Sequence, residues 1–156
     1  MIRTLSFVAV LLLMVGCGFT PETAEAPTVE KQRCYSAEYD AVWAALVATF
    51  AETNLPLEHL DKDSGYISTR EVTAHRSWLH AAEDTIDYKI KNPRGLFNVF
   101  VEQADEGCLV TINAVFTATE ERLNIVLGAG SSVKEFPSSG VMEQALHELL
   151  VQRLAD

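Results

Sequence analysis

The feature that most constrains the fold of this sequence is an alternation of apolar and polar residues between Cys108 and Thr119. One set of alternate positions is apolar, at Val110, Ile112, Ala114 and Phe116, and the other set includes the polar residues Thr111, Asn113 and Thr117. Successive side chains of a β-strand point to opposite faces. The segment is therefore predicted to be a long strand with one apolar face.

Three shorter segments in front of it, 66–72, 86–90 and 97–101, are also predicted to be strands. Turn-forming residues separate these segments, at Ser64-Gly65, at Asn92-Pro93-Arg94-Gly95 and at Asp105-Glu106-Gly107. Such short connections favour antiparallel pairing. A further short strand is expected around residues 31–35. We interpret residues 120–137 as a long loop with room for one short strand, because glycines and Pro137 interrupt the segment.

Two segments have the residue spacing of amphipathic helices. The first is expected to be capped by Ser36 and to end near Asn54, with a stripe formed by Tyr39, Val42, Trp43, Leu46, Val47 and Phe50. The second is expected to start at Ser138 or Ser139, with a stripe formed by Met142, Ala145, Leu146, Leu149, Leu150 and Leu154. Together these elements predict a single α+β domain over residues 31–156. It would have two layers, with an antiparallel sheet of about four to five strands and two helices packed on one face.

The first residues have the pattern of an export signal. Arg3 precedes an apolar run of about 11 residues from Leu5 to Val15, and Gly16 and Cys17 follow. A helix that spans a bilayer needs about 20 apolar residues. We therefore predict a signal peptide over residues 1–16 that is removed after export.

Met14-Val15-Gly16-Cys17 resembles the lipobox of bacterial lipoproteins. This resemblance implies that Cys17 carries a diacylglycerol and becomes the N-terminus of the mature chain, usually with an acyl group such as palmitate on its amine. Two or three acyl chains hold a protein stably on a membrane. Gly18 takes the place of the Asp that retains lipoproteins in the inner membrane, so the resemblance implies the periplasmic face of the outer membrane. The alternative is an ordinary secretory peptide with a chance cysteine.

Residues 17–30 are predicted to form the lipidated N-terminus and a flexible tether, because this segment has two prolines, several acids and few apolar side chains. Removal of residues 1–16 takes away only Arg3 among the charged residues, which leaves 11 basic and 22 acidic side chains and a formal charge of −11. Nucleic-acid affinity depends on lysine and arginine at the phosphates. This charge balance therefore disfavours nucleic acid as a partner.

Two further cysteines, Cys34 and Cys108, would lie in a compartment where disulfides persist. Their even number favours a disulfide between them, which would stabilise the fold by roughly 4 kcal/mol through loop closure. The alternative is two separate thiols, since cysteine is often a small core residue.

Catalytic and cofactor patterns are weak in this sequence. The spacing of His75 and His80 does not suit a metal site, and the four histidines are interpreted as solvent-exposed. Gly128-Ala129-Gly130 lacks the further residues of a nucleotide-binding loop, and neighbouring acids such as Glu120 with Glu121 are typical of a solvated surface. We therefore expect no enzymatic activity, no cofactor and no metal.

Three short motifs resemble the BamC-like family of bacterial outer-membrane assembly lipoproteins. They are Tyr39-Asp40-Ala41-Val42-Trp43-Ala44-Ala45-Leu46, Asp63-Ser64-Gly65-Tyr66-Ile67 and Ser138-Ser139-Gly140-Val141-Met142-Glu143. The resemblance implies a helix-grip fold, in which helices lie across an antiparallel sheet, and a non-catalytic role beside other envelope proteins.

Two functions follow as hypotheses. The first is an accessory lipoprotein in outer-membrane assembly or envelope maintenance, which binds a protein partner through a sheet edge, the acidic surface or the apolar segment 123–127. The second is a protein that binds or senses an apolar small molecule between helix and sheet, which requires a sizeable cavity there.

Overall fold

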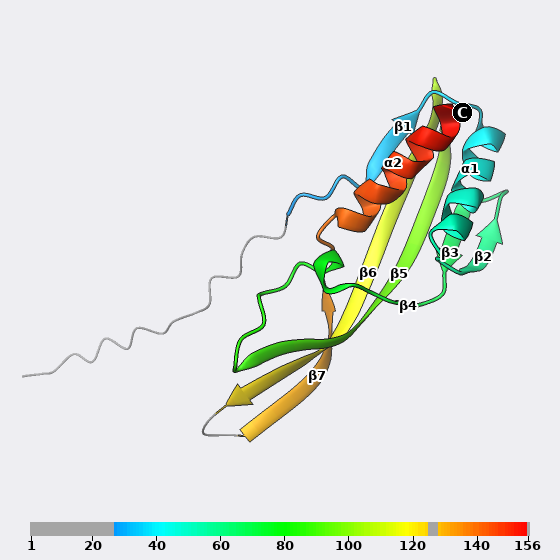
Figure 1. The fold of residues 1–156 in the computed structure, drawn as a ribbon. Helices are drawn as coiled ribbons and strands as arrows, with labels where there is room; N and C mark the ends of the chain where they lie inside the picture. Colours follow the sequence, from blue (N-terminus) through cyan, green and yellow to red (C-terminus); the bar gives the residue numbers. More distant parts are fainter. Residues whose placement is uncertain (1–26, 125–127, 156) are drawn as a thin grey trace, which may run out of the picture.

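The computed structural model describes residues 27–124 and 128–155, and Figure 1 shows their arrangement. The strands are β1 (Gln32–Tyr35), β2 (Leu57–Asp61), β3 (Tyr66–Thr69), β4 (Val72–Thr73), β5 (Tyr88–Ala104), β6 (Gly107–Asn124) and β7 (Gly128–Phe136). The helices are α1 (Tyr39–Glu52), α2 (Val141–Ala155) and the short 3₁₀ helix η1 (Arg76–Trp78). The described residues 27–31 have no regular secondary structure.

All strands belong to one antiparallel sheet. Its strand order is β1-β6-β5-β3-β2, while β4 pairs with β5 and β7 pairs with β6. The helices α1 and α2 contact each other and lie on one face of the sheet (Figure 1). The α+β class is therefore confirmed, but the sheet has seven strands where the sequence predicted about four to five.

The core lies between the helices and the sheet. The largest side chains with almost no exposure come from all of these elements, namely Phe50, Phe97, Phe116, Leu46, Ile67, Ile112, Leu146 and Leu150. The rings of Phe97 and Phe116 meet edge to face with centroids 6.0 Å apart, and Trp78 from η1 packs against both. Edge-to-face contact is a favoured geometry for aromatic pairs, so this cluster joins η1 to the two central strands.

The helix α1 ends where its sequence pattern predicts but begins later. Glu38 occupies the N-cap position, without a side-chain hydrogen bond to the helix, so Ser36 is not the cap. At the other end Thr53 caps the helix and Asn54 has a φ of 53°. Asparagine tolerates this left-handed backbone better than most residues, which allows the chain to reverse before β2.

The predicted turn at residues 92–95 is wrong, because β5 continues through it. The pairing of β5 with β6 shifts register between Lys91 and Arg94, and Asn92 has a φ of 50°. An extra residue in one strand of an antiparallel pair is a β-bulge, which bends the strand without ending it. Pro93 lacks an amide N–H and is tolerated at such a position. The two strands predicted on either side of the turn are thus one strand of 17 residues.

The predicted loop at residues 120–137 is also wrong. The strand β6 extends to Asn124, and β7 pairs with it from Asn124↔Gly128 to Phe116↔Phe136. The residues 125–127, which belong to the apolar segment 123–127, lie outside the described residues. The side chains of β7 are exposed at every position except Phe136. A strand with no buried face has no apolar alternation, so the sequence offered no sign of it.

One end of the sheet is a three-stranded extension, which we call the arm. It consists of residues 88–91 of β5, residues 117–124 of β6 and residues 128–136, which form β7. In Figure 1 the arm projects beyond the two helices, which cover the other end of the sheet. The domain therefore has a body with a helical layer and an arm without one.

Candidate functional site

The predicted lipid site, Cys17, and the predicted signal peptide lie outside the described residues, so their prediction rests on sequence. Within residues 27–124 and 128–155, neither helix has the length and apolar character needed to cross a bilayer.

The structure does not bring Cys34 and Cys108 together as the disulfide prediction requires. The two residues lie on neighbouring strands, where Cys34 pairs with Leu109 and Cys108 pairs with Tyr35. Because Leu109 and Cys108 are consecutive, their side chains point to opposite faces of the sheet, and the cysteines follow. Cys34 is an exposed free thiol, whereas Cys108 is a buried one. Burial also raises the pKa of the Cys108 thiol.

We expect the two thiols to differ in reactivity, because a buried thiol with a raised pKa forms little thiolate. In a Cys17→Ser chain purified without reductant, iodoacetamide should modify Cys34 under native conditions and Cys108 only after unfolding in urea. Peptide mass mapping measures both. Two cysteines that stay unmodified until a reductant is added would contradict this expectation.

The histidines have different environments. His59 and His75 are exposed, and His80 is half-buried. The prediction that all four histidines are exposed is wrong for His147, which has no solvent exposure. No group of three or more potential metal ligands occurs among the described residues.

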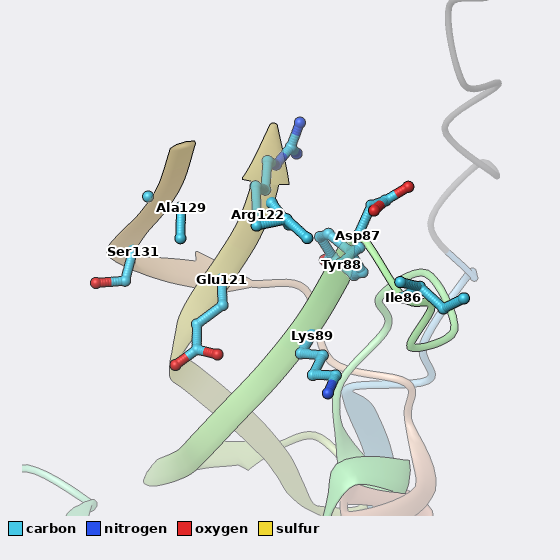
Figure 2. Close-up of a pocket in the computed structure, with 10 residues that line it drawn as sticks. Ile86, Asp87, Tyr88, Lys89, Glu121, Arg122, Ala129 and Ser131 are labelled. Atoms are coloured by element: carbon cyan, nitrogen blue, oxygen red, sulfur yellow. The ribbon is translucent and has the colours of Figure 1, made fainter. Parts of the chain in front are cut away.

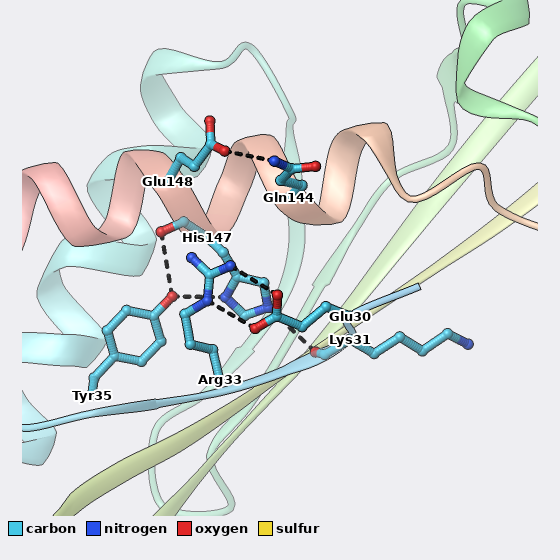
Figure 3. Close-up of polar contacts among 7 residues, drawn as sticks. All are labelled: Glu30, Lys31, Arg33, Tyr35, Gln144, His147 and Glu148. Carbon is cyan, nitrogen blue, oxygen red and sulfur yellow. Dashed lines mark hydrogen bonds and ion pairs between the residues drawn. The ribbon is translucent and has the colours of Figure 1, made fainter. Parts of the chain in front are cut away.

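His147 joins α2 to β1 through hydrogen bonds (Figure 3). Its Nε2 lies 3.3 Å from the carbonyl oxygen of Lys31, which can only accept, so we assign the proton to Nε2. Nδ1 then accepts a 2.7 Å hydrogen bond from the hydroxyl of Tyr35, which also lies 3.3 Å from the carbonyl oxygen of His147. The guanidinium of Arg33 pairs with Glu30 beside this group. The network holds the strand at the N-terminal side of the domain against the last helix.

Burial sets the protonation of this pair. It raises the pKa of Tyr35 to about 12, so the hydroxyl remains a donor. Burial also lowers the pKa of His147 below its usual value, because the charged imidazolium would lose its hydration. The neutral ring is the form that accepts the proton of Tyr35.

Acid should therefore weaken the fold through His147. The unfolded chain binds a proton on this ring at a higher pH than the folded chain does, so the stabilisation is complete above the unfolded pKa of about 6.5 and is lost as the pH falls through the lower folded pKa. We expect the difference in free energy of unfolding between wild type and His147→Gln to shrink from pH 7.5 to pH 5, as measured by urea titration. A difference that does not change with pH would show that His147 is not responsible.

Glu143, one helical turn before His147, is a second polar residue without solvent exposure. One oxygen accepts a 2.8 Å hydrogen bond from Ser138, and among the described residues Oε1 has no partner. The residue lies in the first turn of α2, where the helix dipole favours negative charge. Its hydrogen bond to Ser138 therefore links the start of α2 to the segment that follows the arm.

Within the described residues, the two helices cover one face of the sheet and leave the opposite face open (Figure 1). Val99 and its partner Ile112 are fully buried beneath the helices, so the next pair, Phe100 and Thr111, points to the opposite face. By the same alternation this open face carries Cys34, Tyr66, Leu96, Asn98, Leu109, Asn113 and Val115. Phe100 is 41% exposed and Val115 is 39% exposed. Leu96 and Leu109 are half-buried.

The aromatic residues of the open face are already in contact with each other. The ring of Tyr66 lies 5.0 Å from that of Phe100 and 5.8 Å from that of His59, measured between centroids. The hydroxyl of Tyr66 donates a 2.8 Å hydrogen bond to the side chain of Asn98. This cluster is held in position by the strands and exposes aromatic area, and aromatic residues are enriched at the centres of protein interfaces.

Near its tip the arm has a hollow of about 330 Å³ (Figure 2). Its lining includes Ile86, Tyr88 and Arg122, with the guanidinium carbon 5.6 Å from the centroid of the tyrosine ring. The hollow lies at the surface of the sheet extension, away from the helices. It is therefore distinct from the space between helix and sheet that the small-molecule hypothesis requires.

No protein-family model matches this chain, and no curated protein matches it in sequence.

Proposed function

We propose that this chain is a cell-envelope lipoprotein, anchored through lipid on Cys17 to the periplasmic face of the outer membrane, and that its domain is a non-catalytic module that binds another protein. The export signal and the lipobox-like residues support the location. The resemblance to BamC-like lipoproteins supports a helix-grip-like domain with a role in outer-membrane assembly or envelope maintenance.

The observation that carries the binding role is the uncovered face of the sheet. Sheets with one polar face commonly present it to water, but here Phe100, Tyr66 and Val115 form part of that face. Aromatic residues are enriched at protein interfaces, where they contribute much of the binding energy. The partner is therefore expected to dock over the strands β3, β5 and β6.

The alternative, an apolar small molecule between helix and sheet, has less support. The facing side chains of the helices and sheet, including Phe50, Leu46 and Phe97, have no more than 1% exposure and pack together in the core. A ligand in this layer would have to displace them.

Photo-crosslinking in intact cells tests the binding role. A photo-crosslinking amino acid at position 100 should give a discrete adduct with an envelope protein, identified by mass spectrometry. The matched control carries the same group at position 151, because Val151 is 46% exposed on the outer side of α2. In a Cys17→Ser chain the membrane association and the adduct should both be lost. Equal adducts at positions 100 and 151, or none at either, would contradict binding through the open face.

A further inference from the structure

The arm carries aliphatic side chains that the rest of the domain leaves exposed. Leu123 is 48% exposed, Val133 is 73% exposed, and Ile86, in the segment that leads into β5, is 88% exposed. Leu123 and Val133 lie on the same face of the arm, because Val133 pairs with Thr119, four residues before Leu123 on β6. The amide of Leu123 bonds to the carbonyl oxygen of Asp87, which brings Ile86 to the same end. Leu123 and Ile86 therefore lie near the tip of the arm, and Val133 lies on the same face as Leu123 but closer to the base.

The base of the arm lies beside the point where the described chain begins. Pro27 and Val29 line the same surface hollow as Phe136 and Pro137, which follow the arm. From Phe136 to Gly128 the arm extends about 27 Å, at about 3.3–3.4 Å per residue. Pro27 comes ten positions after Cys17, and a chain of that length spans at most about 35 Å. A lipid on Cys17 would thus hold the bilayer within a distance that the arm can reach.

Charge distinguishes the arm from the body of the domain. The arm has four basic residues, Lys89, Lys91, Arg122 and Lys134, and three acidic ones, Glu120, Glu121 and Glu135, a formal charge of +1. The other described residues include seven basic and sixteen acidic side chains, a formal charge of −9. A negative membrane surface repels the body more strongly than the arm. The orientation with the least repulsion therefore directs the arm toward the bilayer.

We propose that the arm lies against the bilayer that holds the lipid on Cys17, with Leu123, Val133 and Ile86 buried at the level of the headgroups. Lys89 pairs with Glu121, two residues before Leu123 on β6, so it lies on the same face and can extend its charged end to the headgroups. Because the lipid anchor keeps the domain close to the bilayer, the arm needs little affinity of its own for the membrane. The proposal rests on the anchoring proposed above.

Depth-dependent fluorescence quenching tests this proposal. The full-length Leu123→Trp protein is expressed, purified from membranes and reconstituted into vesicles of phosphatidylcholine and anionic phosphatidylglycerol, with or without bromine on the acyl chains. Its matched control is Val151→Trp, which places tryptophan at a similarly exposed aliphatic position near the far end of α2. Trp43 and Trp78 contribute equally to both variants. We expect brominated lipid to lower the emission assigned to residue 123 at least twofold, and that of residue 151 by much less.

The outcomes separate the two proposals. The mass of the purified chain first shows whether Cys17 carries lipid, and an unmodified cysteine would overturn the anchoring and the arm contact together. A lipidated chain whose residues 123 and 151 are quenched equally would overturn the arm contact alone. A lipidated Val133→Trp protein should behave like Leu123→Trp, and it keeps the test valid if the first variant does not fold.

Discussion

Replacing Phe97 with alanine should lower the free energy of unfolding by about 3–5 kcal/mol, the usual cost of removing a buried aromatic ring. Phe97 has no solvent exposure, and its ring contacts those of Trp78 and Phe116. The substitution would leave a cavity between the sheet and η1 that the surrounding strands cannot close. Urea denaturation followed by circular dichroism measures the change.

Phe100→Ala is the matched control, because Phe100 lies three residues further along the same strand and points to the open face. Its ring is 41% exposed and contacts Tyr66, so we expect a loss of about 1 kcal/mol or less. The contrast tests the two-layer fold itself. Similar losses for Phe97→Ala and Phe100→Ala would mean that both faces of the sheet are covered.

Gly107→Ala should destabilise the fold by about 3 kcal/mol or more, because two penalties combine. Gly107 has a φ of 125°, a backbone conformation that residues with a side chain rarely adopt. A Cβ at this position would also lie 2.0 Å from the carbonyl oxygen of Tyr35. The strand β1 would have to shift, and the hydrogen bond between Tyr35 and His147 would shift with it. Thermal and urea unfolding should both reveal the loss.

Gly130→Ala provides the comparison within the same sheet. A Cβ on Gly130 meets no atom within 4 Å, and the residue has no positive φ. The free energy of unfolding should stay within about 1 kcal/mol of wild type, since alanine restricts the unfolded chain without clashing in the folded one. A loss at Gly107 no larger than that at Gly130 would argue against the described conformation of the β5–β6 turn.

The sequence predicted the elements that have one buried side. Helix α1 and the central part of β6 were recognised because their apolar residues recur at the spacing of the element, and that side faces the core. The strand β7 was missed for the opposite reason, since its sequence from Gly128 to Val133 has no face to bury. The segment is a strand because it lies next to β6 in the sheet and pairs with it.

The bulge near Pro93 illustrates a second limit. A proline beside a glycine is typical of a turn, but β6 runs past this point and pairs with β5 on both sides of it. Pairing over such a length favours one bent strand over two short ones. The local residues could not reveal this, because the deciding contacts come from residues 117–122 of another strand.

The sequence alone determined the α+β class and the segments that form the core. It also carries the whole case for export and lipidation, because those signals are read from local residues. Only the tertiary structure decided the seven-stranded sheet, the arm and the burial of His147. It also decided that Cys34 and Cys108 occupy opposite faces. Periodicity shows that a helix or strand has an apolar side. Which residues meet is determined by the register between strands that are distant in sequence, and that register depends on the whole fold.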